Sequence, residues 1–213
     1  GNGKTFIAKA IAQELNAAFF SVSPSDIKDK YVGGTEKNMQ ELFKQARSKE
    51  RAVIFFDETD ALLKKGTSHS SINATQQFLM LADGLTNLPN DNFLLLLGAT
   101  NKPWNIDPAV LRPGRFSERI CVGLPDKNAR IAILNNLLSE LPTQEIDTTK
   151  IAKKIQDFSG ADIALIVKKS AQFAIDNNSD FILQQYFDSV IADSKPSVKQ
   201  EDVDKLVQWG NVK

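Results

Sequence analysis

Cysteine and histidine are almost absent from this sequence of 213 residues. Cys121 is the only cysteine, which excludes an intramolecular disulfide and a cysteine-rich zinc site. His69 is the only histidine, so metal sites that need two histidines are excluded within this sequence. The apolar stretch FLLLLGA is too short to span a membrane. We therefore expect a soluble, intracellular protein, most simply a cytoplasmic one.

An excess of charge of either sign is also missing, because 26 Lys and Arg residues balance 26 Asp and Glu residues. This balance gives no electrostatic reason to expect a nucleic acid or an anionic membrane as partner. Hydrophobic residues make up 42% and charged residues 24%, which is ordinary for a soluble globular protein. The length suits one large domain, or a large domain with a small one.

Apolar runs alternate with segments of helical periodicity through the first part of the chain. The runs at 18–22, 52–56, 93–101 and 119–125 predict strands, and this alternation indicates an α/β fold with a parallel sheet. After Pro125 the strand signals stop and several helical segments follow. We therefore predict an α/β nucleotide-binding domain at 1–125, with its N-terminal part missing from the sequence, and a helical domain at 126–213.

The sequence begins with GNGKT directly before a helical pattern. Gly3, Lys4 and Thr5 match the second half of G-x-x-x-x-G-K-[ST], the phosphate-binding loop of nucleoside triphosphatases. In such a loop, backbone amides at a helix start bind phosphate, Lys4 would neutralise the β- and γ-phosphates, and Thr5 would ligate Mg²⁺. The half motif alone is weak, because an exposed helix start can carry the same residues.

A second motif, VIFFDETD, follows about 50 residues later. It places Asp57 and Glu58 at the carboxyl end of a buried strand, where ligands bind in open α/β sheets. Asp57 is expected to associate with Mg²⁺, and Glu58 to polarise an attacking water. The two motifs together favour nucleotide hydrolysis over a pair of acids in a solvated turn.

Three further polar residues lie at the end of the next apolar run or after it. Asn101 ends that run, where a neutral amide could hold the attacking water or sense the γ-phosphate. Arg112 and Arg115 lie farther on, and an arginine in such a place could reach the γ-phosphate of a neighbouring subunit. A repeated contact of this kind closes most simply in a ring.

The segments GNGKT, VIFFDE, GATN, DPAVLRPGRF and FSGADIALIVKKSA together resemble a module of the classical AAA ATPase family over essentially the whole chain. The resemblance implies a P-loop αβα sandwich with a parallel sheet and a C-terminal helical lid. It further implies an ATP hydrolase that uses ATP and Mg²⁺ in a homo-oligomer, by family habit a hexamer. Residues expected at the nucleotide, besides Lys4 and Thr5, are Gly1, Gly3, Phe6, Gly160 and Ala161.

The segment KYVGG resembles the family's first pore loop, which implies that Tyr31 and Val32 grip a polypeptide substrate. Three residues depart from the family pattern: Thr59 in the Asp-Glu-x-Asp motif, Asn73 near the second pore loop, and Leu137 where relatives often contact the nucleotide. The leading hypothesis is an ATP-driven machine that unfolds, remodels or disassembles proteins. A nucleotide-gated binding or scaffold module with little turnover is the alternative.

The C-terminal helices resemble two groups within the family. One is the meiotic clade, which includes katanin, spastin and fidgetin, and the other is the second ATPase domain of the valosin-containing protein type. The segment RPGR favours the second group, but the sequence as a whole does not decide between the two groups. A nucleic-acid motor of the wider AAA+ group is disfavoured by the zero net charge. The adaptor is not indicated.

Overall fold

The computed structural model describes residues 3–27, 34–66, 69–87 and 92–210. The chain forms two compact units. Among the described residues, the sheet unit comprises Lys4–Cys121 and 208–210, and the helical unit comprises Val122–Val207 together with Gly3. The predicted pore-loop residues Tyr31 and Val32 lie outside the described residues, as does Gly1.

The sheet unit contains alternating helices and strands. These are α1 (Lys4–Glu14), β1 (Ala18–Val22), α2 (Pro24–Ile27), α3 (Gly34–Arg47), β2 (Arg51–Phe56), α4 (Thr59–Leu62), α5 (His69–Asp83) and β3 (Phe93–Gly98), with 3₁₀ turns η1 (Gly84–Asn87), η3 (Pro103–Asn105) and η4 (Pro108–Leu111).

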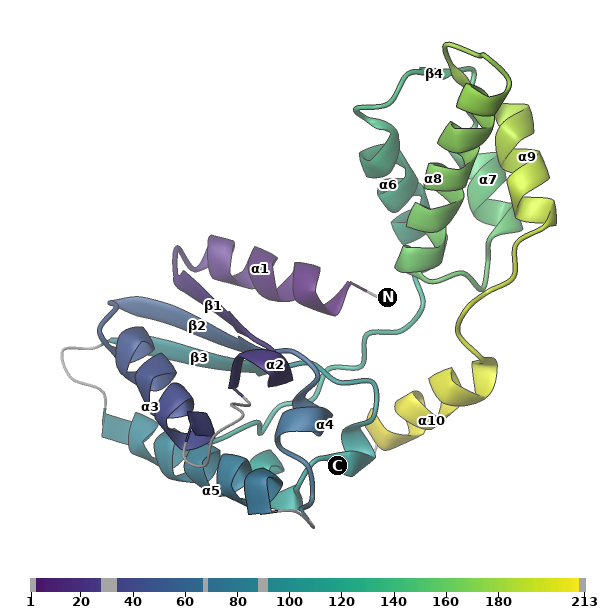
Figure 1. Ribbon diagram of the computed structural model, residues 1–213. Helices are drawn as coiled ribbons and strands as arrows, with labels where there is room; N and C mark the ends of the chain where they lie inside the picture. Colours follow the sequence, from purple (N-terminus) through teal and green to yellow (C-terminus); the bar gives the residue numbers. More distant parts are fainter. Residues whose placement is uncertain (1–2, 28–33, 67–68, 88–91, 211–213) are drawn as a thin grey trace. The chain divides into compact units, whose positions relative to one another are not determined.

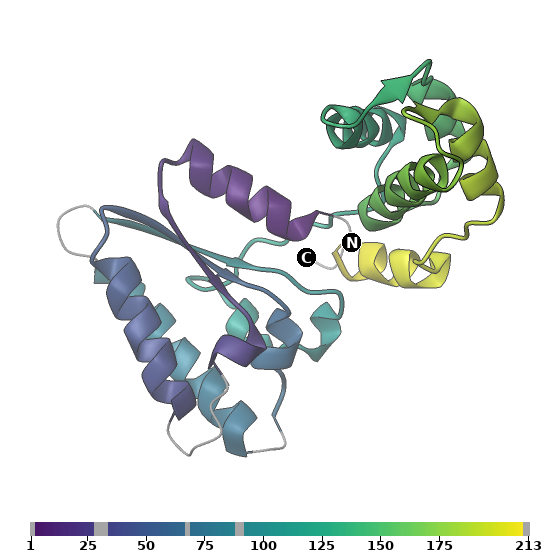
Figure 2. The same ribbon diagram turned by 45° about the horizontal axis from the view of Figure 1, so that its top comes forward.

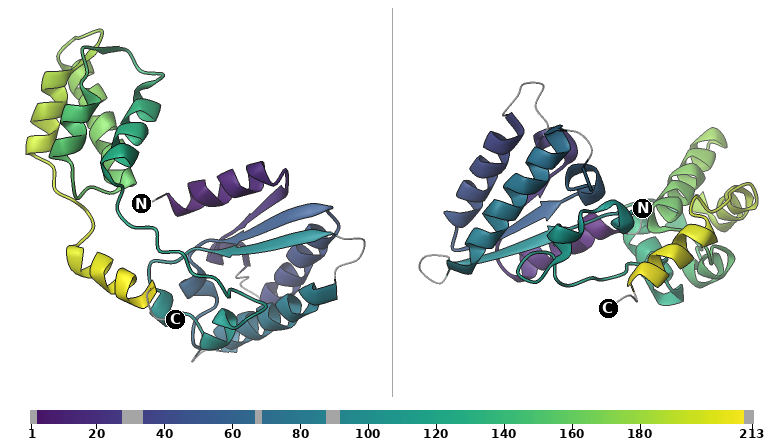
Figure 3. Two further views of the ribbon diagram at one scale, coloured as in Figure 1. Left: turned by 180° about the vertical axis from the view of Figure 1, so that it is seen from behind. Right: turned by 90° about the horizontal axis from the view of Figure 1, so that it is seen from below.

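The described sheet has the order β1-β2-β3, and both strand pairs are parallel. Figures 1 and 2 show α3 and α5 on one face of the sheet and α1 on the other. The two views in Figure 3 show α3 and α5 side by side. Helices on both faces of a parallel sheet form the predicted αβα sandwich, so this part of the fold prediction is confirmed.

The side chains of β2 alternate between the two faces. Ile54 and Phe56 point into the larger core with α3 and α5, whereas Phe55 packs with Ala8 and Ala99 on the α1 side. The small Ala8 allows α1 to lie close to the sheet. Both faces of β2 are therefore covered, which explains why the sequence is a continuous apolar run.

The predicted strand at 119–125 is wrong, since none of these residues belongs to a strand. A strand needs a neighbouring strand to which its backbone can hydrogen-bond. None of the strands described in the sheet pairs with this segment. Ile120 is 87% exposed, so the apolar residues here do not mark a buried element.

The helical unit contains most of the remaining elements. These are α6 (Lys127–Leu138), β4 (Thr143–Gln144), α7 (Thr148–Lys154), α8 (Gly160–Asp176), β5 (Ile182–Leu183), α9 (Gln184–Ala192) and α10 (Gln200–Gly210), with β4 and β5 paired in parallel. The last residues of α10 belong to the sheet unit, where the Arg119 guanidinium lies 4.9 Å from the centre of the Trp209 ring. Of the helices in the described ranges, none has the length and apolar composition needed to cross a membrane.

A buried arginine joins the first two helices of this unit. Arg130 is only 6% exposed and donates hydrogen bonds to the carbonyl oxygens of Pro125, Ala152 and Gln156. Ala152 lies in the last turn of α7, where free carbonyl groups and the helix dipole favour a cation. Arg130 therefore fixes the start of the helical unit against the end of α7.

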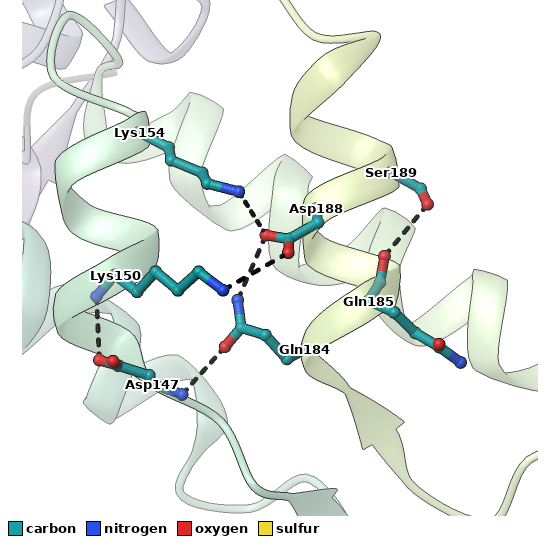
Figure 4. Close-up of polar contacts among 7 residues, drawn as sticks. All are labelled: Asp147, Lys150, Lys154, Gln184, Gln185, Asp188 and Ser189. Atoms are coloured by element: carbon teal, nitrogen blue, oxygen red, sulfur yellow. Dashed lines mark hydrogen bonds and ion pairs between the residues drawn. The ribbon is translucent and has the colours of Figure 1, made fainter.

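Helices α7 and α9 are joined by a polar network on the surface of the unit (Figure 4). Asp188 accepts a hydrogen bond from Lys154 Nζ at 2.8 Å and lies 4.0 Å from Lys150 Nζ. Gln184 accepts a hydrogen bond from the backbone amide of Asp147, the N-cap of α7. Each exposed pair contributes little, and the buried apolar core beneath supplies most of the stability.

Candidate functional site

The predicted phosphate-binding lysine lies beside the predicted sensor at the carboxyl end of the sheet. Lys4 Nζ donates a hydrogen bond to Asn101 Oδ1 at 2.6 Å. The pKa of Lys4 lies below the usual value, because burial disfavours its charged form, while Asp57 and Cys121 act in the opposite direction. The fold therefore brings Lys4, Asp57 and Asn101 to one place from three separate segments.

The residues around Lys4 have the form of a helix start. Gly3 has φ +82°, a left-handed conformation that glycine adopts without a steric penalty. Thr5 lies in the first turn of α1, and Phe6 is 74% exposed. The first amides of an α-helix have no carbonyl partner within the helix, and such amides can bind an anion, so the phosphate site stays a prediction.

The turn after β2 holds Glu58 in an unusual backbone conformation. Glu58 has φ 45° and ψ 46°, a left-handed geometry that costs a residue other than glycine about 1–2 kcal/mol. Its amide donates a hydrogen bond to Asp57 Oδ1 at 2.9 Å, and its side chain is exposed. Residues with strained backbones of this kind occur often at functional sites.

Thr59, which departs from the family pattern, is buried and fully hydrogen-bonded. Its amide donates to Ala99 O at 2.9 Å and its hydroxyl to Phe56 O at 3.0 Å. A Cβ atom at Gly98 would lie 3.0 Å from this hydroxyl, so the hydroxyl occupies space that glycine leaves. In this chain, Thr59 is therefore part of the packing between the turns that follow β2 and β3.

The two predicted arginine fingers differ in their surroundings. Arg115 makes two hydrogen bonds of 2.8 Å to the carboxylate of Asp83 and a third to Ala109 O at 2.6 Å. Arg112 is exposed, and among the described residues its guanidinium has neither a hydrogen bond nor an ion pair. Arg115 is therefore held by groups of its own unit, whereas the described residues do not hold Arg112 in this way.

The loop that carries Arg112 is anchored at both ends. Asp107 caps η4 by accepting a hydrogen bond from the Ala109 amide at 2.8 Å. At the other end, Phe116 stacks on Phe78 with ring centres 5.3 Å apart. These anchors and the Arg115 contacts hold the backbone around Arg112 while its side chain extends into solvent.

Gly160 and Ala161 begin α8 in the helical unit. Ser159 and Asp162 form a reciprocal capping box there, and both are buried. The positions of the two units relative to each other are not determined, so the nucleotide contacts of Gly160 and Ala161 stay predictions. Leu137 packs against the hydrophobic core of the helical unit.

Sequence reasoning did not find two polar contacts near the site. Thr100 Oγ1 donates a hydrogen bond to Asp60 Oδ1 at 2.5 Å across 40 residues of sequence, and Asp83 binds Arg115 across 32. Asp60 belongs to the Asp-Glu-x-Asp motif and Thr100 immediately precedes Asn101, so their proximity to known motifs was the available signal. Their partners could not be found without the fold.

Residues 1–124 match the model of the ATPase family associated with various cellular activities (AAA). The chain is 35% identical to a cell division cycle protein 48 homolog of Archaeoglobus fulgidus, over 96% of this chain and 30% of that protein. It is 40% identical to spastin of Xenopus laevis, over 80% of this chain and 29% of that protein. A putative ribosome biogenesis ATPase nvl of Dictyostelium discoideum is 37% identical, over 95% and 25% respectively.

The chain thus spans about 30% of the length of the first two of these relatives. Similarity to both spastin and the cell division cycle protein 48 homolog agrees with the two groups expected from the sequence, and these identities do not separate them. The family match covers the motifs whose side chains meet at the carboxyl end of the sheet. On these grounds the chain belongs to the AAA family of ATPases.

Proposed function

We propose that this chain is the ATP-hydrolysing module of a ring-shaped machine that remodels, unfolds or disassembles protein substrates. The ring is proposed to be a hexamer, on the basis of family membership. The observation that carries the proposal is the meeting of Lys4, Asp57 and Asn101 beside Glu58. A cation for phosphate, a carboxylate for the metal, a neutral amide and a second carboxylate form a complete set for hydrolysis of a phosphoanhydride.

The residues present suit a magnesium ion. Thr5 and Asp57 offer the hard oxygen ligands that Mg²⁺ prefers. The described residues contain no group of three or more His, Cys, Asp or Glu side chains that could hold a metal alone. Bound Mg²⁺ would neutralise charge on the phosphates, and its remaining ligands would come from ATP and water.

Within the site, the side chains would divide the work of hydrolysis. Lys4 would leave Asn101 for the phosphates of ATP, whose negative charge favours the ammonium form that burial disfavours. The released Asn101 amide would then be free to orient the attacking water. Glu58 would accept a hydrogen bond from that water and take its proton as the water oxygen bonds to the γ-phosphorus. The bond from that phosphorus to the β–γ bridging oxygen would break, so the products would be ADP and inorganic phosphate.

Arg112 supports the proposal of a shared active site. Its side chain extends from an anchored loop without a partner among the described residues. A guanidinium in this position suits the γ-phosphate bound to a neighbouring subunit, where it would stabilise charge in the transition state. Arg115, with its contacts to Asp83 and Ala109, would support the loop instead.

The substrate part of the proposal rests on family membership and on the KYVGG segment. Tyr31 and Val32 would grip a polypeptide through apolar contacts that require no particular sequence. If the alternative scaffold function holds instead, ATP would change partner binding with negligible turnover.

Subunit mixing of the full-length protein tests whether the site is shared. The Arg112→Ala variant keeps an intact hydrolytic site, and the Glu58→Gln variant keeps an intact arginine. We expect each variant alone to hydrolyse ATP slowly and an equal mixture to exceed the mean of the two. Lys49→Ala serves as control, because Lys49 is an exposed residue just after α3. A mixture no faster than the mean, with normal ATP binding, would contradict an arginine acting between subunits.

A further inference from the structure

The turns that follow β2 and β3 are linked by side chains beyond the end of the strand ladder. Thr100 Oγ1 donates to Asp60 Oδ1 at 2.5 Å and accepts a hydrogen bond from the Lys102 amide at 2.8 Å. Asn101 lies between Thr100 and Lys102 in the sequence. The hydroxyl of Thr100 therefore closes a small loop around Asn101 and attaches it to α4.

Asp60 lies two residues after Glu58, the predicted base. Glu58 is the N-cap of the short helix α4, and Asp60 lies in its first turn. Thr59 adds a second link, because its amide donates to Ala99 O. The segment that follows Glu58, the predicted base, is thus hydrogen-bonded to residues 99 and 100, which precede Asn101, the predicted sensor.

These links are not needed to align the two strands. The parallel ladder already pairs β2 with β3 up to Phe56 and Gly98. The Asp60–Thr100 contact lies past that point, where only the turns remain to be fixed. A hydrogen bond to a carboxylate is among the stronger ones, and it restrains the geometry of both turns.

We propose that Asp60 and Thr100 are positioning residues. They hold the Asn101 side-chain amide at the position relative to Glu58 that ATP hydrolysis requires. This inference rests on the proposed function, in which Asn101 and Glu58 act on the attacking water. The two hydrogen bonds of the Thr100 hydroxyl restrain the backbone of residues 100–102. The conformation of that backbone determines the position of the Asn101 side chain. Without the hydroxyl, nucleotide would still bind through Lys4 while the attacking water lost its orientation.

Substitution of Thr100 in the full-length protein tests the proposal. Thr100→Val keeps the side-chain shape and removes the hydroxyl, and Thr100→Ser restores a hydroxyl. We expect Thr100→Val to lower kcat about 10- to 100-fold, the scale of a misplaced reacting group, with little change in the KM for ATP. Thr100→Ser should recover most of the activity.

The chain offers a matched control at Thr75. This residue lies in α5, is 5% exposed, and its hydroxyl has no hydrogen-bond partner among the described residues. Thr75→Val makes the same chemical change at a buried position away from the site. It should leave kcat unchanged, and a loss equal to that of Thr100→Val would overturn the positioning role.

A double-mutant cycle with Asn101→Ala separates this inference from the proposed function. If Thr100 acts through Asn101, Thr100→Val should lower kcat no further once Asn101 is alanine. Additive losses would overturn the positioning role alone and leave the proposed function in place. An Asn101→Ala variant with normal kcat would instead remove Asn101 from the hydrolytic mechanism, and the inference with it.

Discussion

The ammonium group of Lys4 donates a hydrogen bond to the amide oxygen of Asn101 across 97 residues of sequence. The bond joins the first turn of α1 to the third residue after β3. In the proposed site, ATP would replace Asn101 as the partner of Lys4. The same lysine would thus hold the site together before the nucleotide binds and would bind phosphate afterwards.

Loss of the Lys4 charge should weaken ATP binding. We expect Lys4→Met to raise the dissociation constant about 10- to 100-fold, the effect of losing a hydrogen bond between charged groups. Lys9→Met is the matched control, because Lys9 is an exposed lysine on the same helix. Binding can be followed with a fluorescent ATP analogue. Equal affinity in both variants would contradict the assignment of Lys4.

The left-handed backbone at Glu58 gives a second prediction, which concerns stability. At φ 45° glycine has no steric penalty and alanine does, so Glu58→Gly should be about 1 kcal/mol more stable than Glu58→Ala. Denaturant unfolding measures this difference. Both variants should hydrolyse ATP slowly. A more stable alanine variant would show that residue 58 has no left-handed strain.

A side chain at Gly98 should disturb the packing beneath the site. An added Cβ would lie 3.0 Å from Thr59 Oγ1 and 3.3 Å from the ring of Phe116. Gly98→Ala should therefore lower the free energy of unfolding by about 1–3 kcal/mol. Gly123→Ala, where an added Cβ has no neighbour within 4 Å in the described structure, is the control. If both variants unfold at the same denaturant concentration, the tight contact is not present.

Asp162 makes the stability of the helical unit depend on pH. Burial raises its pKa, but hydrogen bonds from Ser197 and Ser159 outweigh burial, and the net pKa is lowered. A carboxyl group with a lowered pKa stabilises the fold above its unfolded-state pKa, and this stabilisation is lost as pH falls through the folded-state value. Thermal unfolding should therefore show a loss of stability in acid, below about pH 4.

Asp162→Asn provides the comparison for that experiment. The amide keeps an oxygen that can accept hydrogen bonds but does not titrate, so the acid-dependent loss should be smaller in this variant. Asp188, whose pKa is lowered mainly by its hydrogen bond from Lys154, should still contribute a loss of the same sign. Identical pH profiles for the variant and the parent protein would exclude Asp162 as the source.

The sequence predicted the elements whose signals are local. The run at 52–56 is apolar on both faces of a strand and ends in Asp57 and Glu58, so burial and position could both be inferred. The run at 119–125 carries a similar signal without a pairing partner, and composition alone cannot distinguish the two cases. Strand formation depends on a neighbouring strand, and that strand can be distant in sequence.

The same limit applies to the site. Lys4, Asp57 and Asn101 were predicted because each lies in a motif, and the fold brings them together. The bonds from Arg115 to Asp83 and from Thr100 to Asp60 join residues more than 30 positions apart. Side-chain partners at such separations follow from the packing of α4 and α5 against the sheet, which residue patterns do not encode.

The close contact of Thr59 with Gly98 restricts how this module can change in evolution. Because the threonine hydroxyl fills the space above the glycine, any larger residue at 98 meets it first. Loss of the hydroxyl would open that space but leave the carbonyl of Phe56 without its side-chain donor. The two positions are therefore epistatic: the order in which they mutate changes the stability of the intermediate protein, and lineages that carry threonine at 59 should retain glycine at 98.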